Sequence, residues 1–224
     1  MSVSKFDRFL PIAGILAGLL LVAVNALTWS SPDSTDAADL TAYGSSHETR
    51  VLIAGFAMAY VAVLLAFFAV ALRGAIRSGE ADESTFSSVA FAGGLMVAVA
   101  SALWSYVSLT TLSAVTDGNA AAVSAMVHFS SLSWLPWLIG SAVLYLSVGI
   151  GALRTAAMPR WLAFVTIGLG VLCLTGVGGI AVYLATPLWL IVAGFVLHQR
   201  LAAAAPPRTA TAAPAAPAAP SVHV

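Results

Sequence analysis

The chain has 224 residues, of which 60 % are hydrophobic and only 8 % are charged. Soluble domains carry roughly 25 % charged residues, and a soluble fold of this size cannot bury so much apolar surface. The formal net charge is zero, so no overall field favours nucleic acid as a partner. The composition therefore predicts an all-α membrane protein. The single cysteine, Cys173, excludes a disulfide within the chain.

The first half of the chain predicts three membrane-crossing helices. One crossing needs about 20 apolar residues, because the hydrocarbon core is about 30 Å thick and a helix rises about 1.5 Å per residue. Apolar stretches at about 9–28, 51–72 and 88–109 have that length. Ser45 and Glu48 have the spacing of a capping box, which predicts the start of the second helix.

The first apolar stretch has a second interpretation as a cleaved signal peptide. Val24 and Ala26 fit a small-residue cleavage site that follows a basic N-terminus. However, the apolar region is longer than that of most signal peptides, and Trp29 follows it as an interfacial anchor does. We therefore expect a retained helix, with cleavage as the alternative.

A short helix at the membrane surface is predicted between the third and fourth crossings. Residues 117–119, Asp-Gly-Asn, are typical of a turn. After this turn, Val123 and Val127 share one helical face and His128 lies on the opposite face. Such an amphipathic helix suits the external interface of the bilayer.

The second half predicts three further crossings. Ser133 and Pro136 are typical of a first helical turn, which predicts a fourth crossing at about 134–153. The stretch Trp161–Leu197 has no charged residue or histidine and is long enough for two crossings. A glycine-rich turn near its middle predicts a hairpin of helices at about 161–176 and 178–198.

The distribution of charge predicts the topology. If the N-terminus is cytoplasmic, every one of the nine Lys and Arg residues except Arg50 falls on the cytoplasmic side. Residues 1–200 are therefore expected to form a six-transmembrane-helix bundle with both termini inside and one short external interfacial helix. Ala and Pro dominate residues 201–224, which predicts a disordered cytoplasmic tail.

Few side chains suggest chemistry. No Asp, Glu, Lys, Arg or His lies in the middle of a predicted crossing, which disfavours ion-coupled transport and a transmembrane haem. His47 and His128 could meet at the outer surface as a zinc or copper site, but their spacing matches no metal motif. The sequence therefore predicts no catalytic residue, no cofactor and no metal.

Small residues recur at a spacing of four, which allows helix backbones to approach closely in lipid. Packing within the bundle explains them, with a homodimer or another membrane protein as the alternative. These residues are Gly14 and Gly18 in the first crossing, Ala90, Gly94, Ala98 and Ala102 in the third, and Ala181 and Ala185 in the sixth.

Aromatic residues gather toward the predicted outer leaflet, where an interfacial belt is the plain explanation. The sharper hypothesis is an outward-facing cavity for an amphipathic or lipid-like ligand, covered by the segment 117–131. The belt would comprise Trp29, Tyr60, Trp104, Tyr106, Trp134, Trp137 and Tyr183. The candidate cavity lining is Trp104, Tyr106, Trp134, Trp137 and His128.

The segment Met158–Leu162, Met-Pro-Arg-Trp-Leu, resembles a pattern in bacterial membrane proteins of about six helices. That family has no assigned function, and its last helix often carries a proline and a later glycine, as Pro187 and Gly194 do here. The resemblance and the Ala/Pro-rich composition imply an actinobacterial chain in the bacterial cytoplasmic membrane. They imply no activity, ligand or site residue.

Three functions follow from these observations. The first is a non-enzymatic binding or partner-interaction protein in contact with membrane lipids. The second is a small-molecule or lipid transporter that uses the aromatic cavity. The third is a membrane enzyme acting at the external face, for which the sequence offers no catalytic motif.

Overall fold

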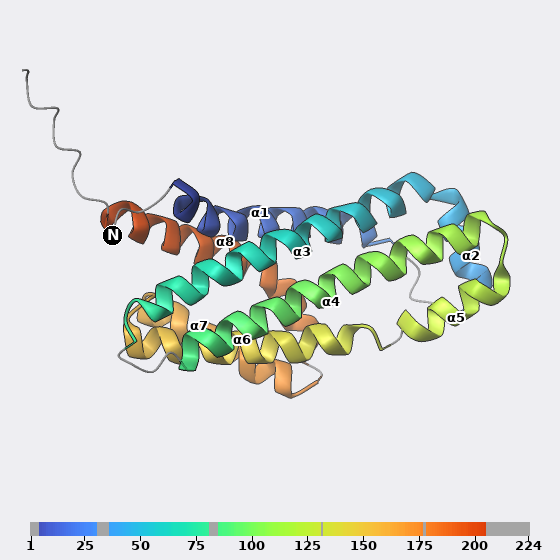
Figure 1. Ribbon diagram of the computed structural model, residues 1–224. Helices are drawn as coiled ribbons and strands as arrows, with labels where there is room; N and C mark the ends of the chain where they lie inside the picture. Colours follow the sequence, from blue (N-terminus) through green and yellow to red (C-terminus); the bar gives the residue numbers. More distant parts are fainter. Residues whose placement is uncertain (1–4, 31–35, 81–84, 131, 177, 205–224) are drawn as a thin grey trace, which may run out of the picture.

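The computed structural model describes residues 5–30, 36–80, 85–130, 132–176 and 178–204, and its secondary structure is helical throughout these ranges (Figure 1). Residues 1–4 and most of the predicted tail, 205–224, lie outside the described residues. The helices are α1 (Lys5–Thr28), α2 (Ala37–Ser46), α3 (Glu48–Arg77), α4 (Thr85–Thr116), α5 (Ala120–Ser130), α6 (Trp134–Thr155), α7 (Arg160–Leu174) and α8 (Gly178–Ala204).

Five helical stretches are long and apolar enough to cross a membrane, which supports a multi-pass membrane protein. α7, which corresponds to the predicted fifth crossing, is apolar but has only 15 residues, fewer than the about 20 that one crossing needs. The five stretches are Phe9–Thr28, Glu48–Arg77, Thr85–Thr116, Ala120–Thr155 and Gly178–Ala203, of which the fourth comprises α5 and α6.

The segment before α3 differs from the prediction. It contains α2, which begins where the side chain of Asp36 accepts a hydrogen bond of 2.9 Å from the backbone N–H of Ala38. Ser45 lies inside α2 and donates to the carbonyl of Ala42, while His47 occupies the N-cap position of α3 without a side-chain cap. The predicted capping box was therefore wrong, because its serine belongs to a preceding helix.

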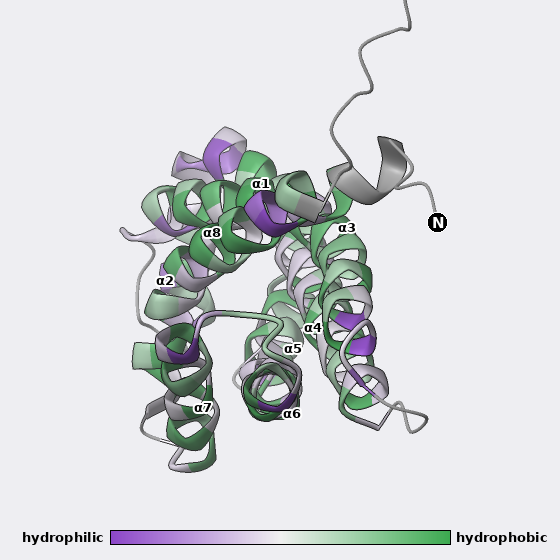
Figure 2. Ribbon diagram, turned by 90° about the vertical axis from the view of Figure 1, so that its left-hand side faces the viewer, coloured by the Kyte–Doolittle hydropathy of each residue, from purple (hydrophilic) through white to green (hydrophobic). Residues whose placement is uncertain are grey.

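The long helices form an arc. α1 packs between α8 and α3, α4 packs between α3 and α6, and α6 packs between α4 and α7 (Figure 2). A smaller contact between α7 and α8, the two arms of the predicted hairpin, completes the ring. The hairpin turn lies where the glycines predicted it, with Gly176 at φ 69° and α8 beginning at Gly178.

Glycines bring neighbouring helices into backbone contact. A Cβ added to Gly18 would lie 2.6 Å from the carbonyl oxygen of Pro187 on α8. A Cβ added to Gly93 would lie 2.5 Å from the backbone nitrogen of Leu144 on α6. Only a residue without a side chain permits these approaches, which maximise dispersion contacts where lipid supplies no hydrophobic drive.

The small-residue faces are divided between the bundle and its surface. Those on α1 and most of those on α4 pack inside the bundle, as the favoured explanation predicted. The buried members are Gly14, Gly18, Ala90, Gly94 and Ala98, whereas Ala102 and Ala181 are exposed and Ala185 is half-buried.

A cluster of polar and aromatic side chains occupies the centre of the ring of helices. The Tyr145 hydroxyl of α6 donates to the Thr186 hydroxyl of α8 at 2.8 Å, since Thr186 itself donates to the carbonyl of Val182. The indole N–H of Trp189 donates to the Thr166 hydroxyl of α7 at 2.8 Å. These side chains are almost fully buried, so their hydrogen bonds are satisfied within the protein.

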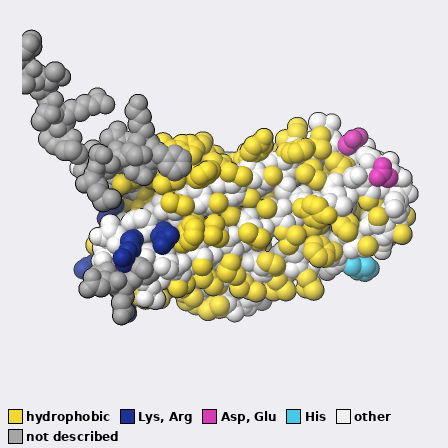
Figure 3. Space-filling view, in the orientation of Figure 1, with side chains coloured by type: hydrophobic (Ala, Val, Ile, Leu, Met, Phe, Trp, Pro, Cys, Tyr) yellow, Lys and Arg dark blue, Asp and Glu magenta, His cyan; other side chains and the backbone are white. Residues whose placement is uncertain are grey.

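The two ends of the bundle differ in charge. In Figure 3, Lys and Arg side chains gather at the end where α1 begins and α8 ends, and Asp, Glu and His side chains gather at the opposite end. At the basic end, the guanidinium of Arg200 donates to the carbonyl of Ala156, which ties the end of α8 to the start of the α7–α8 hairpin. At the acidic end, α2 and α5 pack against α4 around Val115, Val123 and Val127.

The close approach at Gly93 predicts a large effect of a single methyl group. Gly93→Ala should lower the free energy of unfolding by about 1–3 kcal/mol, because the added Cβ meets the backbone of Leu144 and α6 must shift. Thermal unfolding of the purified protein in mild detergent measures this change. Gly168→Ala is the matched control, since a Cβ there has no atom within 4 Å. Equal melting temperatures for the two variants would contradict the packing argument.

Candidate functional site

A cavity of about 710 Å³ lies between five of the helices. This volume is within the range of about 300–1,000 Å³ that is usual for small-molecule sites. Its walls are mainly apolar and aromatic, with a few hydroxyl groups. The lining residues are Thr28, Met58, Ala100, Trp104, Ser133, Trp134, Trp137, Leu138, Gly176, Gly179, Ile180 and Tyr183.

The cavity exists because the α7–α8 hairpin does not fill the whole length of the ring. The 15 residues of α7 extend about 22 Å, less than the ~30 Å of a hydrocarbon core. Gly179 at the hairpin tip packs against Leu138, because a Cβ added to this glycine would lie 3.0 Å from Cδ1 of Leu138. Leu138 lies one turn after Trp134, the first residue of α6, so the tip meets α6 near its start. The hairpin tip therefore forms one wall of the cavity.

Hydrogen bonds and ring contacts fix the cavity wall. The Tyr183 hydroxyl of α8 donates to Oδ1 of Asn25 on α1 at 2.7 Å. The ring of Trp137 packs edge-on against Tyr183, with 5.3 Å between centroids. On the opposite wall, Ala100 and Trp104 are four residues apart and therefore share one face of α4. The hydrogen bond and the ring contact hold Tyr183 and Trp137 in defined positions before any ligand enters.

Three of the five candidate lining residues come together in this cavity, namely Trp104, Trp134 and Trp137. Tyr106 does not line it and is 65 % exposed on the outer face of α4. Two residues along a helix differ by about 200° in direction, so Tyr106 and Trp104 cannot share a face. His128 is also outside the lining and is exposed on α5, because the opposite face of that helix packs on α4 and α2.

The predicted aromatic belt therefore divides into two groups. Trp29, Tyr60 and Tyr106 point outward, with exposed fractions of 80 %, 66 % and 65 %. Tyr183 lines the cavity with Trp104, Trp134 and Trp137, and it was not in the predicted lining. The lone amide of Asn25 in an apolar helix was the sequence signal for this wall, because a polar side chain at membrane depth needs a partner.

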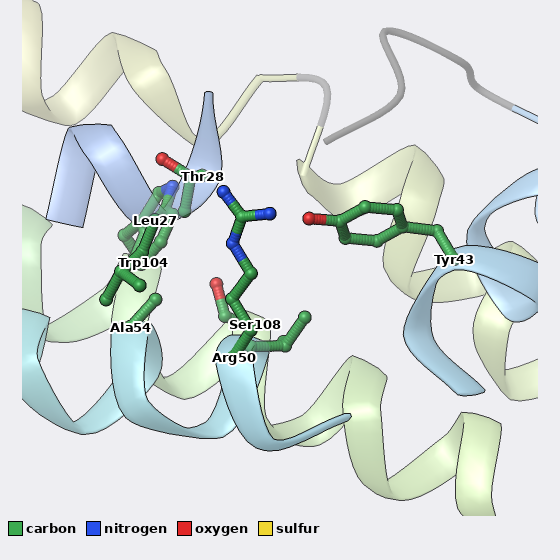
Figure 4. A pocket seen from close by; sticks show the side chains of 8 residues that line it. Leu27, Thr28, Tyr43, Arg50, Ala54, Trp104 and Ser108 are labelled. Carbon is green, nitrogen blue, oxygen red and sulfur yellow. The ribbon is translucent and has the colours of Figure 1, made fainter. Parts of the chain in front are cut away.

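A second, smaller hollow of about 100 Å³ adjoins the main cavity and shares Thr28 and Trp104 with it. It differs from the main cavity by containing the charged side chain of Arg50 and the ring of Tyr43 (Figure 4). Its complete lining is Leu27, Thr28, Tyr43, Arg50, Val51, Ala54, Trp104 and Ser108. The two hollows together have an apolar part and a polar, cationic part.

The histidines of the hypothetical metal site have other contacts. His47 stacks on the ring of Tyr43 at 4.4 Å, and its Nδ1 lies 2.8 Å from the Ser46 hydroxyl. Within the described ranges, no group of three or more His, Cys, Asp or Glu side chains is placed to hold a metal ion.

The chain matches no family model, no curated protein and no solved structure. The resemblance of Met158–Leu162 to a bacterial membrane protein family therefore stays a prediction. A functional assignment depends on the geometry of the two hollows.

The Tyr183–Asn25 hydrogen bond predicts coupling between α8 and α1. Tyr183→Phe and Asn25→Ala should each lower the free energy of unfolding by about 1 kcal/mol, and the double variant should lose less than the sum. Thermal unfolding in detergent measures the cycle. Tyr60→Phe is the control, because Tyr60 is 66 % exposed on the surface of α3. Strictly additive losses would contradict a direct hydrogen bond.

Proposed function

We propose that the protein is a multi-pass membrane protein that binds an apolar or amphipathic small molecule in the aromatic cavity. The observation that carries this proposal is the 710 Å³ cavity, whose walls include Trp104, Trp137 and Tyr183. Concave, mostly apolar sites with a few polar groups are typical of ligand sites. This function belongs to the binding class that the sequence favoured and needs no catalytic group.

The proposal includes a topology of six membrane segments with both termini in the cytoplasm. The gathering of basic side chains at one end supports it (Figure 3). The contact of Arg200 with Ala156 also supports it, because the hairpin of α7 and α8 then returns to the side from which it enters. In this orientation the cavity lies in the outer half of the membrane, and α2 and α5 lie outside it. The membrane of this proposal is the bacterial cytoplasmic membrane.

Binding is better supported than transport. The side chains of Tyr145, Thr186 and Trp189 fill the centre of the ring of helices and are almost fully buried. Thr186 lies one helical turn from Tyr183 of the cavity wall, so this cluster lies immediately behind the cavity. A transported molecule would have to displace it. Transport therefore requires a second conformation, whereas binding requires only the observed one.

The cavity predicts saturable quenching of tryptophan fluorescence by an apolar probe. Bromododecanol, a brominated long-chain alcohol, should quench Trp104, Trp134 and Trp137 when it enters. Ala100→Phe adds a ring to the cavity wall and should weaken binding about tenfold, equivalent to about 1.4 kcal/mol. Titration of the purified protein in mild detergent measures the dissociation constant.

Ala102→Phe is the matched control for this titration. It adds the same ring to the same helix, but Ala102 is exposed and lies outside the cavity lining. Its dissociation constant should equal that of the unmodified protein. Equal, non-saturable quenching in all three proteins would refute binding in the cavity.

A further inference from the structure

We infer that the ligand of the cavity is an anionic amphiphile and that Arg50 binds its charged head. The inference rests on the proposed function, because it names the class of molecule that the aromatic cavity takes. The alkyl part would occupy the aromatic cavity, and a carboxylate or phosphate would occupy the smaller hollow beside it.

The two hollows are adjacent parts of one site. Thr28 at the end of α1 and Trp104 on α4 line both of them. The larger hollow is mostly apolar, whereas the smaller has Arg50, Tyr43 and Ser108 in its wall. A molecule that spans both therefore meets apolar surface at one end and a cation with hydroxyl groups at the other. This is the distribution of polarity within an amphiphile.

The guanidinium of Arg50 is directed into the smaller hollow, toward the hydroxyl of Tyr43 (Figure 4). One terminal nitrogen donates to the Ser30 hydroxyl at 2.7 Å and the other donates to the carbonyl of Ala26 at 3.1 Å. Both of these partners are neutral. Among the described residues, other N–H donors of the guanidinium remain for a ligand, and their planar arrangement matches the two oxygens of a carboxylate or phosphate.

The charge balance also favours an anionic head. Arg50 is half-buried, and a guanidinium forms stronger hydrogen bonds with a charged acceptor than with a neutral one. In the predicted topology, Arg50 is also the one basic residue of the sequence that lies on the external side of the membrane. The surrounding end of the bundle carries Asp and Glu side chains (Figure 3), so no general positive field attracts anions there. Selectivity for an anion must therefore come from direct contact with Arg50.

A purely structural role for Arg50 makes a different prediction. Its bond to Ala26 satisfies a carbonyl in the last turn of α1, and its bond to Ser30 holds the residues after that helix. If this were its entire role, replacing Arg50 would lower stability and leave any preference between charged and neutral ligands unchanged. A comparison of two ligands that share an alkyl part and differ in the charge of the head group separates the two roles.

The experiment is native mass spectrometry of the full chain released from mild detergent. Hexadecanoate and hexadecanol are offered separately, since they share an alkyl chain and differ in charge. Dioleoyl phosphatidylglycerol and dioleoyl phosphatidylcholine form a second pair, which distinguishes a membrane phospholipid from a free fatty acid. The variants are Arg50→Gln, Arg50→Lys and the control Arg73→Gln, which removes a cation near the opposite end of α3.

In the unmodified protein we expect one anionic molecule to bind about tenfold or more tightly than its neutral counterpart, in at least one pair. Arg50→Gln should abolish this preference, Arg50→Lys should keep most of it because the charge remains, and Arg73→Gln should keep all of it. A preference for hexadecanoate indicates a free acid, and a preference for phosphatidylglycerol indicates a membrane lipid; either supports the inference.

Two results would overturn the inference in different ways. If the two members of each pair bind equally and Arg50→Gln changes none of these affinities, the aromatic cavity binds ligands but Arg50 does not select them. The proposed function then stands without the anionic head. If no member of either pair binds saturably, the inference and the proposed function fail together. If Arg50→Gln does not fold, the comparison within each pair on the unmodified protein still tests the inference, because equal affinities in both pairs overturn it.

Discussion

The position of the α7–α8 hairpin depends on Trp189. Its indole donates to Thr166 of α7, and its ring packs edge-on against Tyr145 of α6 and Phe68 of α3, at centroid distances of 4.8 and 6.1 Å. Lipid gives helices no hydrophobic reason to associate, so shape and buried hydrogen bonds determine where each one lies. A single side chain thus connects four helices and joins α8, at one end of the arc, to α7 at the other end.

This central contact also determines where the interior is empty. Side chains fill the ring around Trp189, but the short α7 ends at Leu174 and the hairpin tip meets α6 at Leu138. Beyond that tip, α1, α3, α4 and α6 continue without the hairpin between them, and aromatic side chains line part of the remaining space. The cavity is thus a consequence of unequal helix lengths, and the Tyr183–Asn25 bond secures its wall.

The sequence predicted the helices better than their faces. Apolar length identified α1, α3, α4, α6 and the hairpin, since crossing a bilayer imposes a length. It missed α2, which is short and whose stability depends on packing against α4 and α5. It also assigned Tyr106 and Trp104 to one cavity, although only Trp104 faces inward. In a helix that is apolar all round, no difference in hydrophobicity distinguishes the lipid-facing side from the buried side. Tertiary contacts therefore determine which side faces the lipid.

The inferred site gives Arg50 a binding role in addition to the structural role of its hydrogen bonds. Its bonds to Ala26 and Ser30 fix the guanidinium beside the end of α1, which reduces the entropy that a ligand would otherwise lose in ordering it. A preorganised cation at the mouth of an apolar cavity discriminates between ligands by charge, whereas the aromatic walls discriminate only by shape and apolar area. The structural bonds therefore support the proposed selectivity, because a guanidinium free to move into water would contribute little to it.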